Sequence, residues 1–232
     1  MINAFIMAGQ SNMAGRGIIG DVPPIEIEGR IFMLRNGKWV PMSEPINPDR
    51  AIYVSDRTKI RSGISPAASF AKAWIDNNEG SVGLIPCADG GTAIDEWQPG
   101  TVLFDNLIQQ TKLAMRSSEI CGVLWHQGES DSKTEEAALA HAGKLAIVIN
   151  GIREELGLPD LPFIMGELAY KHKRWPYTEI VNNGMHALCG SVPHIGIASC
   201  EGYEIGPDTL HFTAAFYREF GVRYYGVYEK VK

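Results

Sequence analysis

Residues 5–15 read FIMAGQSNMAG, and this stretch decides the fold because an apolar run stops abruptly on glycine and polar residues. The apolar run 5–8 predicts a strand that is buried on both faces of a sheet. Gly9 permits a sharp turn at the end of that strand. A serine that follows a parallel strand directly, as Ser11 does, projects over the edge of the sheet. Ser11 is therefore either an ordinary turn residue or a nucleophile.

The rest of the chain predicts an α/β fold, because short apolar runs alternate with longer amphipathic stretches. Strands are expected at Ala4–Ala8, Ile31–Leu34, Val82–Pro86, Cys121–Trp125, Pro162–Glu167 and His194–Ala198. Helices are expected over 65–77, 105–117, 134–156, 177–189 and 213–229. Strands that are separated by helices imply crossovers and a parallel sheet covered on both faces. No linker or repeat interrupts the pattern, so we expect one domain over 1–232.

Polar loops follow the predicted strands, at the edge where open α/β sheets bind their ligands. In sequence order these loops read GQSNM, CADGGTAIDEW, WHQGESD and DTLHFT. In the last of them, Asp208 and His211 are three residues apart, a spacing that presents an imidazole with a carboxylate behind it. Such an imidazole can take a proton from the hydroxyl of Ser11. A helix cap at Asp208 would also explain the spacing.

The two middle loops contain groups that could stabilise the negative charge of a tetrahedral intermediate. The backbone N–H groups of Gly90 and Gly91 can turn inward, since no Cβ blocks them, and Gln127 offers a side-chain amide. The alternative is that the glycine pair only makes a turn and that Gln127 and Glu129 only satisfy buried backbone groups. Each structural explanation is plausible for one loop alone. Because all four loops occur together and in this order after the strands, the sequence favours acyl transfer.

Together, these loops resemble the conserved blocks of the SGNH-hydrolase superfamily, and within it the carbohydrate esterase family 6 and sialate O-acetylesterase-like group. GQSNMAG is similar to the nucleophile block, ADGGTAIDEW to the second, WHQGESD to the third and DTLHFT to the last. In the third block, Gln127 stands where the wider superfamily has asparagine. The resemblance spans residues 5–213 in order.

The resemblance implies a serine esterase that removes acetyl groups from sugars such as acetylxylan or sialic acid. Its fold would be a flavodoxin-like three-layer sandwich with a five-stranded parallel sheet. Ser11 would be the nucleophile, His211 the general base and acid, and Asp208 the partner that orients His211. The implied oxyanion donors are the Ser11 backbone N–H, the N–H of Gly90 or Gly91, and the Gln127 amide.

The resemblance also suggests supporting roles for other polar and aromatic residues. Gln10 is expected to hold the nucleophile loop, and Glu129 to bond loop backbone around the site. Trp97 and Trp125 could stack on a sugar, although core packing suits Trp125 better. The competing hypotheses are a carbohydrate-binding protein of the same fold without catalysis, and an esterase that acts on a small acetyl ester other than a sugar.

Composition restricts the partners and cofactors of the protein. A formal net charge of −6 argues against nucleic acid as the main partner, and the basic run 171–174 fits a solvated loop. The four cysteines form no C-x-x-C pair, so neither a zinc site nor a disulfide framework is indicated, and we expect free thiols without a cofactor. A metal site formed by His126, Glu129 and His211 is a weaker hypothesis.

The chain contains neither a signal-peptide pattern nor an apolar run long enough to cross a membrane. We therefore expect a cytoplasmic location for the chain as given, or a secreted protein if a signal peptide has been removed. The sequence does not indicate an oligomeric state.

Overall fold

The sheet at the centre of the protein has seven strands, in the order β3-β2-β4-β1-β5-β6-β7. The computed structural model describes residues 1–48, 62–170 and 173–232. Within these ranges the strands are β1 (Ile2–Gly9), β2 (Ile31–Arg35), β3 (Lys38–Pro41), β4 (Ser81–Pro86), β5 (Ser118–His126), β6 (Phe163–Gly166) and β7 (Ile195–Ala198). Every pairing is parallel except that of β2 with β3.

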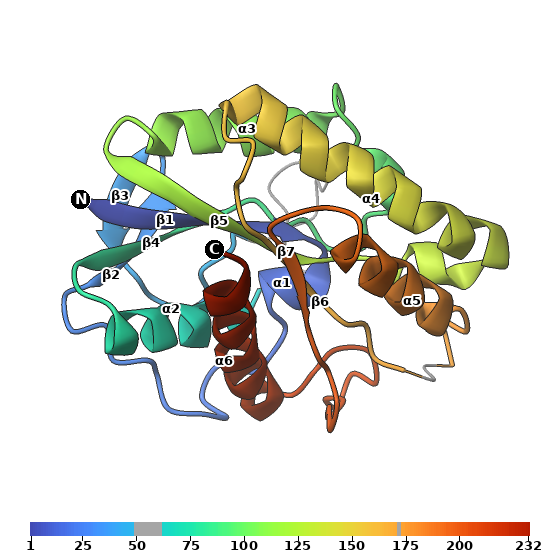
Figure 1. Ribbon diagram of the computed structural model, residues 1–232. Coiled ribbons are helices and arrows are strands. Elements are labelled where there is room, and N and C mark those ends of the chain that lie inside the picture. The colour runs from blue at the N-terminus through green and yellow to red at the C-terminus, as the bar shows by residue number, and fades with distance from the viewer. Residues whose placement is uncertain (49–61, 171–172) are drawn as a thin grey trace.

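Helices cover both faces of this sheet, so the fold is a three-layer α/β sandwich (Figure 1). The longer helices are α2 (Pro66–Asn77), α3 (Val102–Ala114), α4 (Glu135–Leu156), α5 (Thr178–Cys189) and α6 (Ala214–Val231). Helices α2 and α6 pack on one face, and α3, α4 and α5 pack on the other. Short turns of helix, α1 (Ser11–Ala14), η1 (Ile94–Trp97) and η2 (Asp131–Lys133), lie in the connections. The predicted helices and strands are all present.

The first strand shows why its sequence is continuously apolar. Phe5 and Met7 point into the core between the sheet and helices α2 and α6. Ala4, Ile6 and Ala8 point into the opposite core, under α3 and α4. Because both faces of β1 are covered, neither set of side chains reaches water, as expected for a central parallel strand.

The expected number of five strands is wrong, because two further strands extend one edge of the sheet. Strands β4-β1-β5-β6-β7 form a parallel array in the flavodoxin-like order, and β2 and β3 continue it beyond β4. Strand β3 returns antiparallel through a tight turn at Asn36-Gly37, where both residues have positive φ. An Asn-Gly pair is a strong hairpin signal, so this turn is one that the sequence could have predicted.

This strand order places a ligand site beside β1. The chain runs from β1 to β2 and β4 on one side of β1, and later to β5 on the other side. The connections that leave the adjacent strands β1 and β5 therefore run in opposite directions at the carboxyl end of the sheet. Open α/β sheets bind their ligands at such a position. Gly9 at the end of β1 pairs with His126 at the end of β5, so the GQSN and HQGES loops are neighbours.

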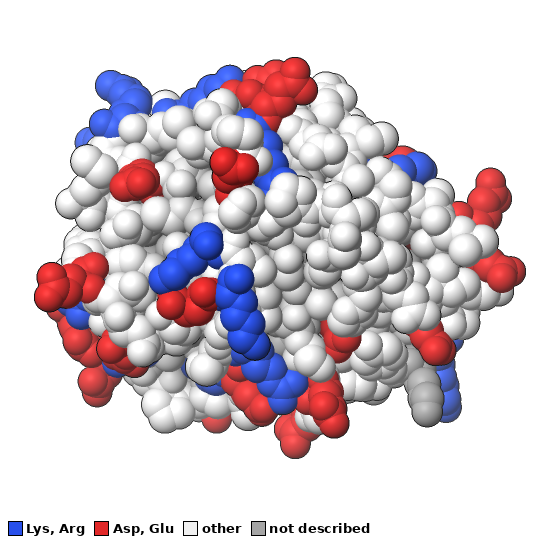
Figure 2. All heavy atoms as spheres, viewed as in Figure 1, with Lys and Arg blue, Asp and Glu red and all other residues white. Residues whose placement is uncertain are grey.

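The outer surface carries charges of both signs (Figure 2), and the cysteines are unpaired. On the face drawn in Figure 2, basic and acidic side chains are interspersed. The cysteines of the chain are free thiols, with Cys87 and Cys200 buried and Cys121 and Cys189 half-buried. In the part of the chain that the structure describes, none of the helices has the length and apolar character needed to cross a membrane.

Candidate active site

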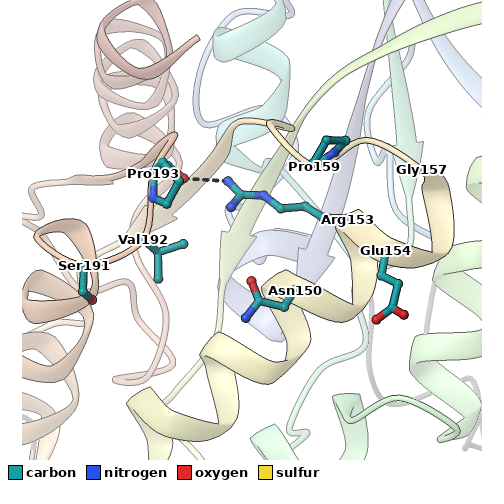
Figure 3. A pocket seen from close by; sticks show the side chains of 8 residues that line it. All are labelled: Asn150, Arg153, Glu154, Gly157, Pro159, Ser191, Val192 and Pro193. Atoms are coloured by element: carbon teal, nitrogen blue, oxygen red, sulfur yellow. Dashed lines mark hydrogen bonds between the residues drawn. The ribbon is translucent and has the colours of Figure 1, made fainter.

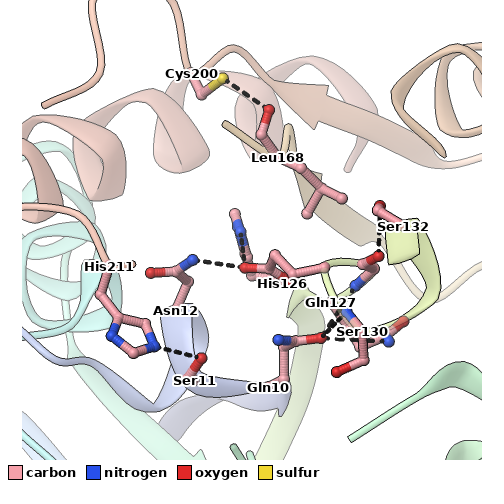
Figure 4. Close-up of polar contacts among 12 residues, drawn as sticks. Gln10, Ser11, Asn12, His126, Gln127, Ser130, Ser132, Leu168, Cys200 and His211 are labelled. Atoms are coloured by element: carbon pink, nitrogen blue, oxygen red, sulfur yellow. Dashed lines mark hydrogen bonds and ion pairs between the residues drawn. The ribbon is translucent and has the colours of Figure 1, made fainter. Parts of the chain in front are cut away.

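Ser11, His211 and Asp208 form a continuous hydrogen-bonded chain (Figure 4 shows the Ser11–His211 contact). The Ser11 Oγ lies 2.9 Å from Nε2 of His211, and Nδ1 of His211 lies 2.6 Å from Oδ2 of Asp208. The carboxylate accepts from Nδ1–H, so Nε2 is left free to accept the serine proton. The loop after β1 supplies Ser11, and the segment after β7 supplies Asp208 and His211. Ser11 and His211 are 200 positions apart in the sequence. This is the geometry of a serine nucleophile with an oriented base.

The loop itself fixes the Asp208 carboxylate. Its Oδ1 accepts hydrogen bonds from the backbone N–H groups of Leu210, at 2.9 Å, and His211, at 3.0 Å. Partial burial raises the pKa of Asp208, but the hydrogen bond from the His211 ring and those from the backbone outweigh it and hold this pKa below its usual value. Asp208 therefore stays ionised next to His211. The helix-cap alternative does not apply, since Thr213 is the N-cap of α6.

A close approach of two strands positions the nucleophile. Gly9 has a φ of 118°, and a Cβ on it would lie 2.2 Å from the carbonyl oxygen of His126. Only glycine can turn the chain at this position, as the sequence suggested. The next residue, Gln10, donates its backbone N–H to the same carbonyl over 2.8 Å. Ser11 then begins the short helix α1, directly over the end of β1.

The structure separates the two glycines of the second loop. Gly90 is buried, and a Cβ on it would lie 3.4 Å from Cβ of Ser11. Gly91 is exposed, has a φ of 81°, and would place a Cβ in open space. Gly90 therefore lies beside the nucleophile, and Gly91 provides the turn. Within the described residues, the backbone N–H groups of Ser11 and Gly90 have no hydrogen-bond acceptor.

Gln127 does not lie where the resemblance placed it. Its side chain is fully buried, and its Nε2 donates to the Thr92 carbonyl over 3.0 Å and to Oδ2 of Asp131 over 2.5 Å. Its Oε1 lies 3.0 Å from Nε2 of His141. Its Nε2 also lies 3.5 Å from Oε1 of Gln10. All these acceptors are groups of the protein, and Gln127 is not among the residues that line the pocket at Ser11. The geometry does not support the expectation of a direct oxyanion donor.

Gln10 and Glu129 connect the first and third loops (Figure 4 shows Gln10 beside the third loop). The Oε1 of Gln10 accepts long hydrogen bonds of 3.4 Å from the backbone N–H groups of Gly128 and Ser130. Glu129 is buried, and its Oε1 accepts from Nδ2 of Asn12 over 2.6 Å. Glu129 therefore bonds a side chain of the turn that carries Ser11, whereas we expected it to bond loop backbone.

Glu129 is also the centre of a buried polar group. Its Oε1 lies 3.4 Å from Nε2 of His126, whose Nδ1 lies 3.3 Å from the hydroxyl of Tyr224. Burial raises the pKa of Glu129, but the facing His126 imidazole and the hydrogen bond from Asn12 outweigh it, so the pKa of Glu129 lies below its usual value. A buried carboxylate is thus held beneath the turn that carries Ser11.

A pocket of about 610 Å³ opens over the nucleophile. Its lining residues, from the loops at the carboxyl end of the sheet, are Gln10, Ser11, Arg16, Gly90, Gly91, Ser130, Lys133, Arg174, Trp175, Leu210 and His211. The motifs of the sequence did not indicate the basic and aromatic members of this group. Arg174 belongs to the basic run that we interpreted as a solvated loop, of which residues 171–172 lie outside the described residues.

The aromatic residue in the pocket is Trp175, whereas the expected candidates lie in the core. Trp97 and Trp125 are fully buried and meet edge to face, with ring centroids 5.3 Å apart. The indole Nε1–H of Trp97 donates to Oγ1 of Thr92 over 3.0 Å. Core packing of Trp125 agrees with the expectation, but Trp97 cannot stack on a sugar because none of its surface is accessible. No signal in the sequence distinguishes Trp175 from the other tryptophans.

The proposed metal ligands are not arranged as a metal site. The His126 ring packs edge to face against Phe212 and Phe220. His211 is engaged by Ser11 and Asp208 instead. Among the residues with a described position, no group of three or more His, Cys, Asp or Glu side chains could hold a metal ion.

A second cavity, of about 580 Å³, lies near the C-terminal end of α4 (Figure 3). The Arg153 guanidinium at this cavity donates to the carbonyl oxygens of Leu161 and Pro193, over 2.9 Å and 2.8 Å. These carbonyls precede β6 and β7, so the cavity lies at the amino end of the sheet, opposite to Ser11. Arg153 joins two loops there, and the hydroxyl of Ser191, which also lines the cavity, donates to the carbonyl oxygens of Ala187 and Leu188.

Comparisons with known proteins show which family the chain belongs to. The sequence matches the family described as "Carbohydrate esterase, sialic acid-specific acetylesterase" over residues 1–230. The chain belongs to this family. It is 30% identical over 236 residues to the "Probable carbohydrate esterase At4g34215" of Arabidopsis thaliana, a match that covers 94% of this chain and 86% of that protein.

Two solved structures have the same fold as this chain. The X-ray structure of the Arabidopsis thaliana protein superposes with a TM-score of 0.84, at 27% identity and with 98% of each chain covered. The crystal structure of NanS gives a TM-score of 0.75 at 16% identity, with 99% of this chain and 97% of that chain covered. The resemblance to carbohydrate esterases of the SGNH-hydrolase superfamily is thus confirmed for the whole length of the chain.

Proposed function

We propose that this carbohydrate esterase removes O-acetyl groups from sugars by a serine mechanism with an acyl-enzyme intermediate. The observation that carries the proposal is the Ser11–His211 contact of 2.9 Å, with Asp208 on the other ring nitrogen. Family membership supports an ester substrate. The pocket over Ser11 is open to solvent and large enough for a sugar unit.

In the first half of the reaction, Ser11 Oγ attacks the carbonyl carbon of the ester while Nε2 of His211 accepts its proton. Asp208 stabilises the resulting imidazolium through Nδ1–H. The carbonyl oxygen becomes an oxyanion, for which the N–H groups of Ser11 and Gly90 are the donors. When the intermediate collapses, the sugar oxygen leaves with the proton from Nε2, and the acetyl group remains on Ser11.

In the second half, a water molecule takes the place of the sugar. Nε2 of His211 removes a proton from this water as its oxygen attacks the acyl carbon. The same N–H donors stabilise the second oxyanion. Protonation of Ser11 Oγ by His211 then releases acetate, so the enzyme returns to its starting state and one water is consumed.

The serine mechanism is tested on Ser11 itself. Ser11→Ala should abolish turnover of p-nitrophenyl acetate while the circular dichroism spectrum stays unchanged, and a fluorophosphonate should label only the wild type. Thr111→Val, a buried change on α3 away from the pocket, is the matched control. A folded wild type without activity toward any acetyl ester would instead favour a carbohydrate-binding protein.

The charge of the pocket supports an acidic substrate. Arg16, Lys133 and Arg174 line it, and none of its described lining residues is Asp or Glu, although the chain has a net charge of −6. Clustered cations attract an anionic ligand and bind carboxylates well. We therefore propose that the preferred ester is an acetylated sugar acid, such as a sialate or a uronate, over neutral acetylxylan.

This preference is tested by comparing acetylated substrates with and without a carboxylate. Lys133→Gln should raise KM for an O-acetyl sugar acid by about 5- to 10-fold, as expected for the loss of one ionic contact, and leave KM for acetylated xylose within about twofold. Lys112→Gln, an exposed lysine on α3 that pairs with Glu155, is the control. Equal effects of Lys133→Gln on both substrates would contradict an acidic preference.

A further inference from the structure

The reaction described above makes no use of a buried polar group behind the second loop. Gln127, Asp131 and His141 have exposed fractions of 0%, 4% and 0%. They come from the β5 loop, η2 and α4. Burying three polar side chains costs free energy unless each is satisfied by hydrogen bonds. Their partners therefore indicate what the group does.

The Gln127 amide holds the segment that follows the glycine pair. Its Nε2 donates to the Thr92 carbonyl over 3.0 Å. Thr92 in turn closes the turn around Gly90 and Gly91, because its Oγ1 donates to the Asp89 carbonyl over 2.8 Å. The loop whose Gly90 lies against Ser11 is thus fixed from behind by Gln127.

Asp131 holds the same segment at a second point. Its two carboxylate oxygens accept from the backbone N–H of Ile94 at 3.2 Å and 3.1 Å. Its Oδ2 also accepts from Nε2 of Gln127 over 2.5 Å. One carboxylate therefore binds both the loop and the amide that holds it.

His141 determines which way the Gln127 amide faces. Burial lowers the pKa of His141 to about 4, so the ring is neutral near pH 7. Its Nε2, 3.0 Å from Oε1 of Gln127, is then the protonated nitrogen, because a carbonyl oxygen can only accept. With acceptors at Nε2, a flipped amide would turn its oxygen toward the Thr92 carbonyl and the Asp131 carboxylate and would lose its hydrogen bonds to both.

We propose that Asp131, Gln127 and His141 form a positioning unit that aims the Gly90 N–H at the oxyanion, and that Gln127 itself does not contact the oxyanion. This inference rests on the proposed serine mechanism. A donor that moves by about 1 Å loses much of its effect on the transition state, since charge develops only at one place. The unit acts on kcat and leaves ground-state binding unchanged.

The test compares variants of His141, which contacts Gln127 and does not line the pocket at Ser11. His141→Phe removes the donor to Oε1 and should lower kcat for p-nitrophenyl acetate by about 10- to 100-fold with KM within about twofold. His141→Gln retains an N–H donor and should recover most of this loss. Thr111→Val controls for a general loss of stability, and thermal melts report whether each variant is folded.

A crystal structure of the phosphonylated wild type makes the test independent of how the variants fold. The phosphonyl oxygen should lie within hydrogen-bond distance of the Gly90 N–H, with Gln127 Nε2 still on Thr92 and Asp131. A phosphonyl oxygen bonded to Gln127 Nε2, or a folded His141→Phe with wild-type kcat, would overturn the positioning role alone. A wild type that neither turns over esters nor forms the adduct would overturn the serine mechanism as well.

Discussion

Tyr217 Oη donates a hydrogen bond to Oδ1 of Asn12 over 2.5 Å, and this contact joins the nucleophile turn to helix α6. Asn12 follows Ser11 directly, and α6 begins three residues after His211. The contact therefore connects the segments that carry the nucleophile and its base. It lies in the core, because both side chains are buried.

Replacing Tyr217 with phenylalanine should loosen this connection. Tyr217→Phe leaves Oδ1 of Asn12 buried without its donor, which costs about 1–3 kcal/mol of unfolding free energy. Because the Ser11–His211 distance is then less tightly held, kcat should fall by about 3- to 10-fold. Urea unfolding and steady-state kinetics measure the two effects. Tyr228→Phe on the same helix is the control, and equal losses in both variants would argue against a specific role of the contact.

Asp208→Asn separates the orientation of His211 from the presence of a side chain at position 208. An asparagine amide can present a donor toward Nδ1, which stabilises the wrong tautomer of the imidazole. We expect kcat to fall by about 10²–10⁴, with KM changed little. Stopped-flow or steady-state assays with p-nitrophenyl acetate measure this loss. A near-normal rate would mean that another group orients His211.

The glycine pair gives a prediction that distinguishes its two members. Gly90→Ala places a Cβ 2.5 Å from Nη2 of Arg16, whose flexible side chain must move aside, and 3.4 Å from Cβ of Ser11, so the added methyl group contacts the residue proposed as nucleophile. We expect kcat to fall by about 10²-fold or more. Gly91→Ala meets no atom but strains a φ of 81°, which should lower the unfolding free energy by about 1 kcal/mol with little effect on kcat. The reverse pattern would make Gly91 the donor.

The sequence predicted part of the candidate site because a loop that directly follows a strand with a clear apolar pattern lies at a known edge of the sheet. Ser11 after β1 is the example, since the order of the strands then determines where the residue lies. The same reasoning could not locate the partners of Gln127. Those partners, Asp131 and His141, depend on how η2 and α4 cross the second loop, and local patterns do not contain that information.

Residues of the pocket wall were missed for a different reason. Arg174 and Trp175 lie between β6 and α5 in a segment without helical or strand periodicity. A charged, irregular segment has the same composition whether it faces open solvent or a pocket. Trp97, by contrast, lies in the block ADGGTAIDEW, which resembles a block of the family. For this reason we expected that its ring could stack on a sugar. Only packing shows that its ring points into the core.

The stability of the protein should depend on pH through His141. The pKa of this histidine falls from 6.5 to about 4 in the folded protein, first because burial disfavours the charged ring and second because Lys144 repels it, whereas Glu129 acts in the opposite direction. Between pH 6.5 and 4 the unfolded chain binds a proton at His141 that the folded protein does not bind. The free energy of unfolding should therefore decrease as the pH falls through this range, by about 3 kcal/mol in total.

His141→Gln isolates this contribution, because glutamine keeps an N–H donor for Gln127 but does not titrate. Urea unfolding of both proteins at pH 7, about 5.5 and about 4.5 gives the two pH dependences. Carboxylates that titrate in the same range contribute equally to both proteins, so the difference in slope belongs to His141. The variant should lose less stability than the wild type on acidification. Parallel curves would show that the pKa of His141 is the same in the folded protein and in the unfolded chain, which would contradict a ring held neutral by burial.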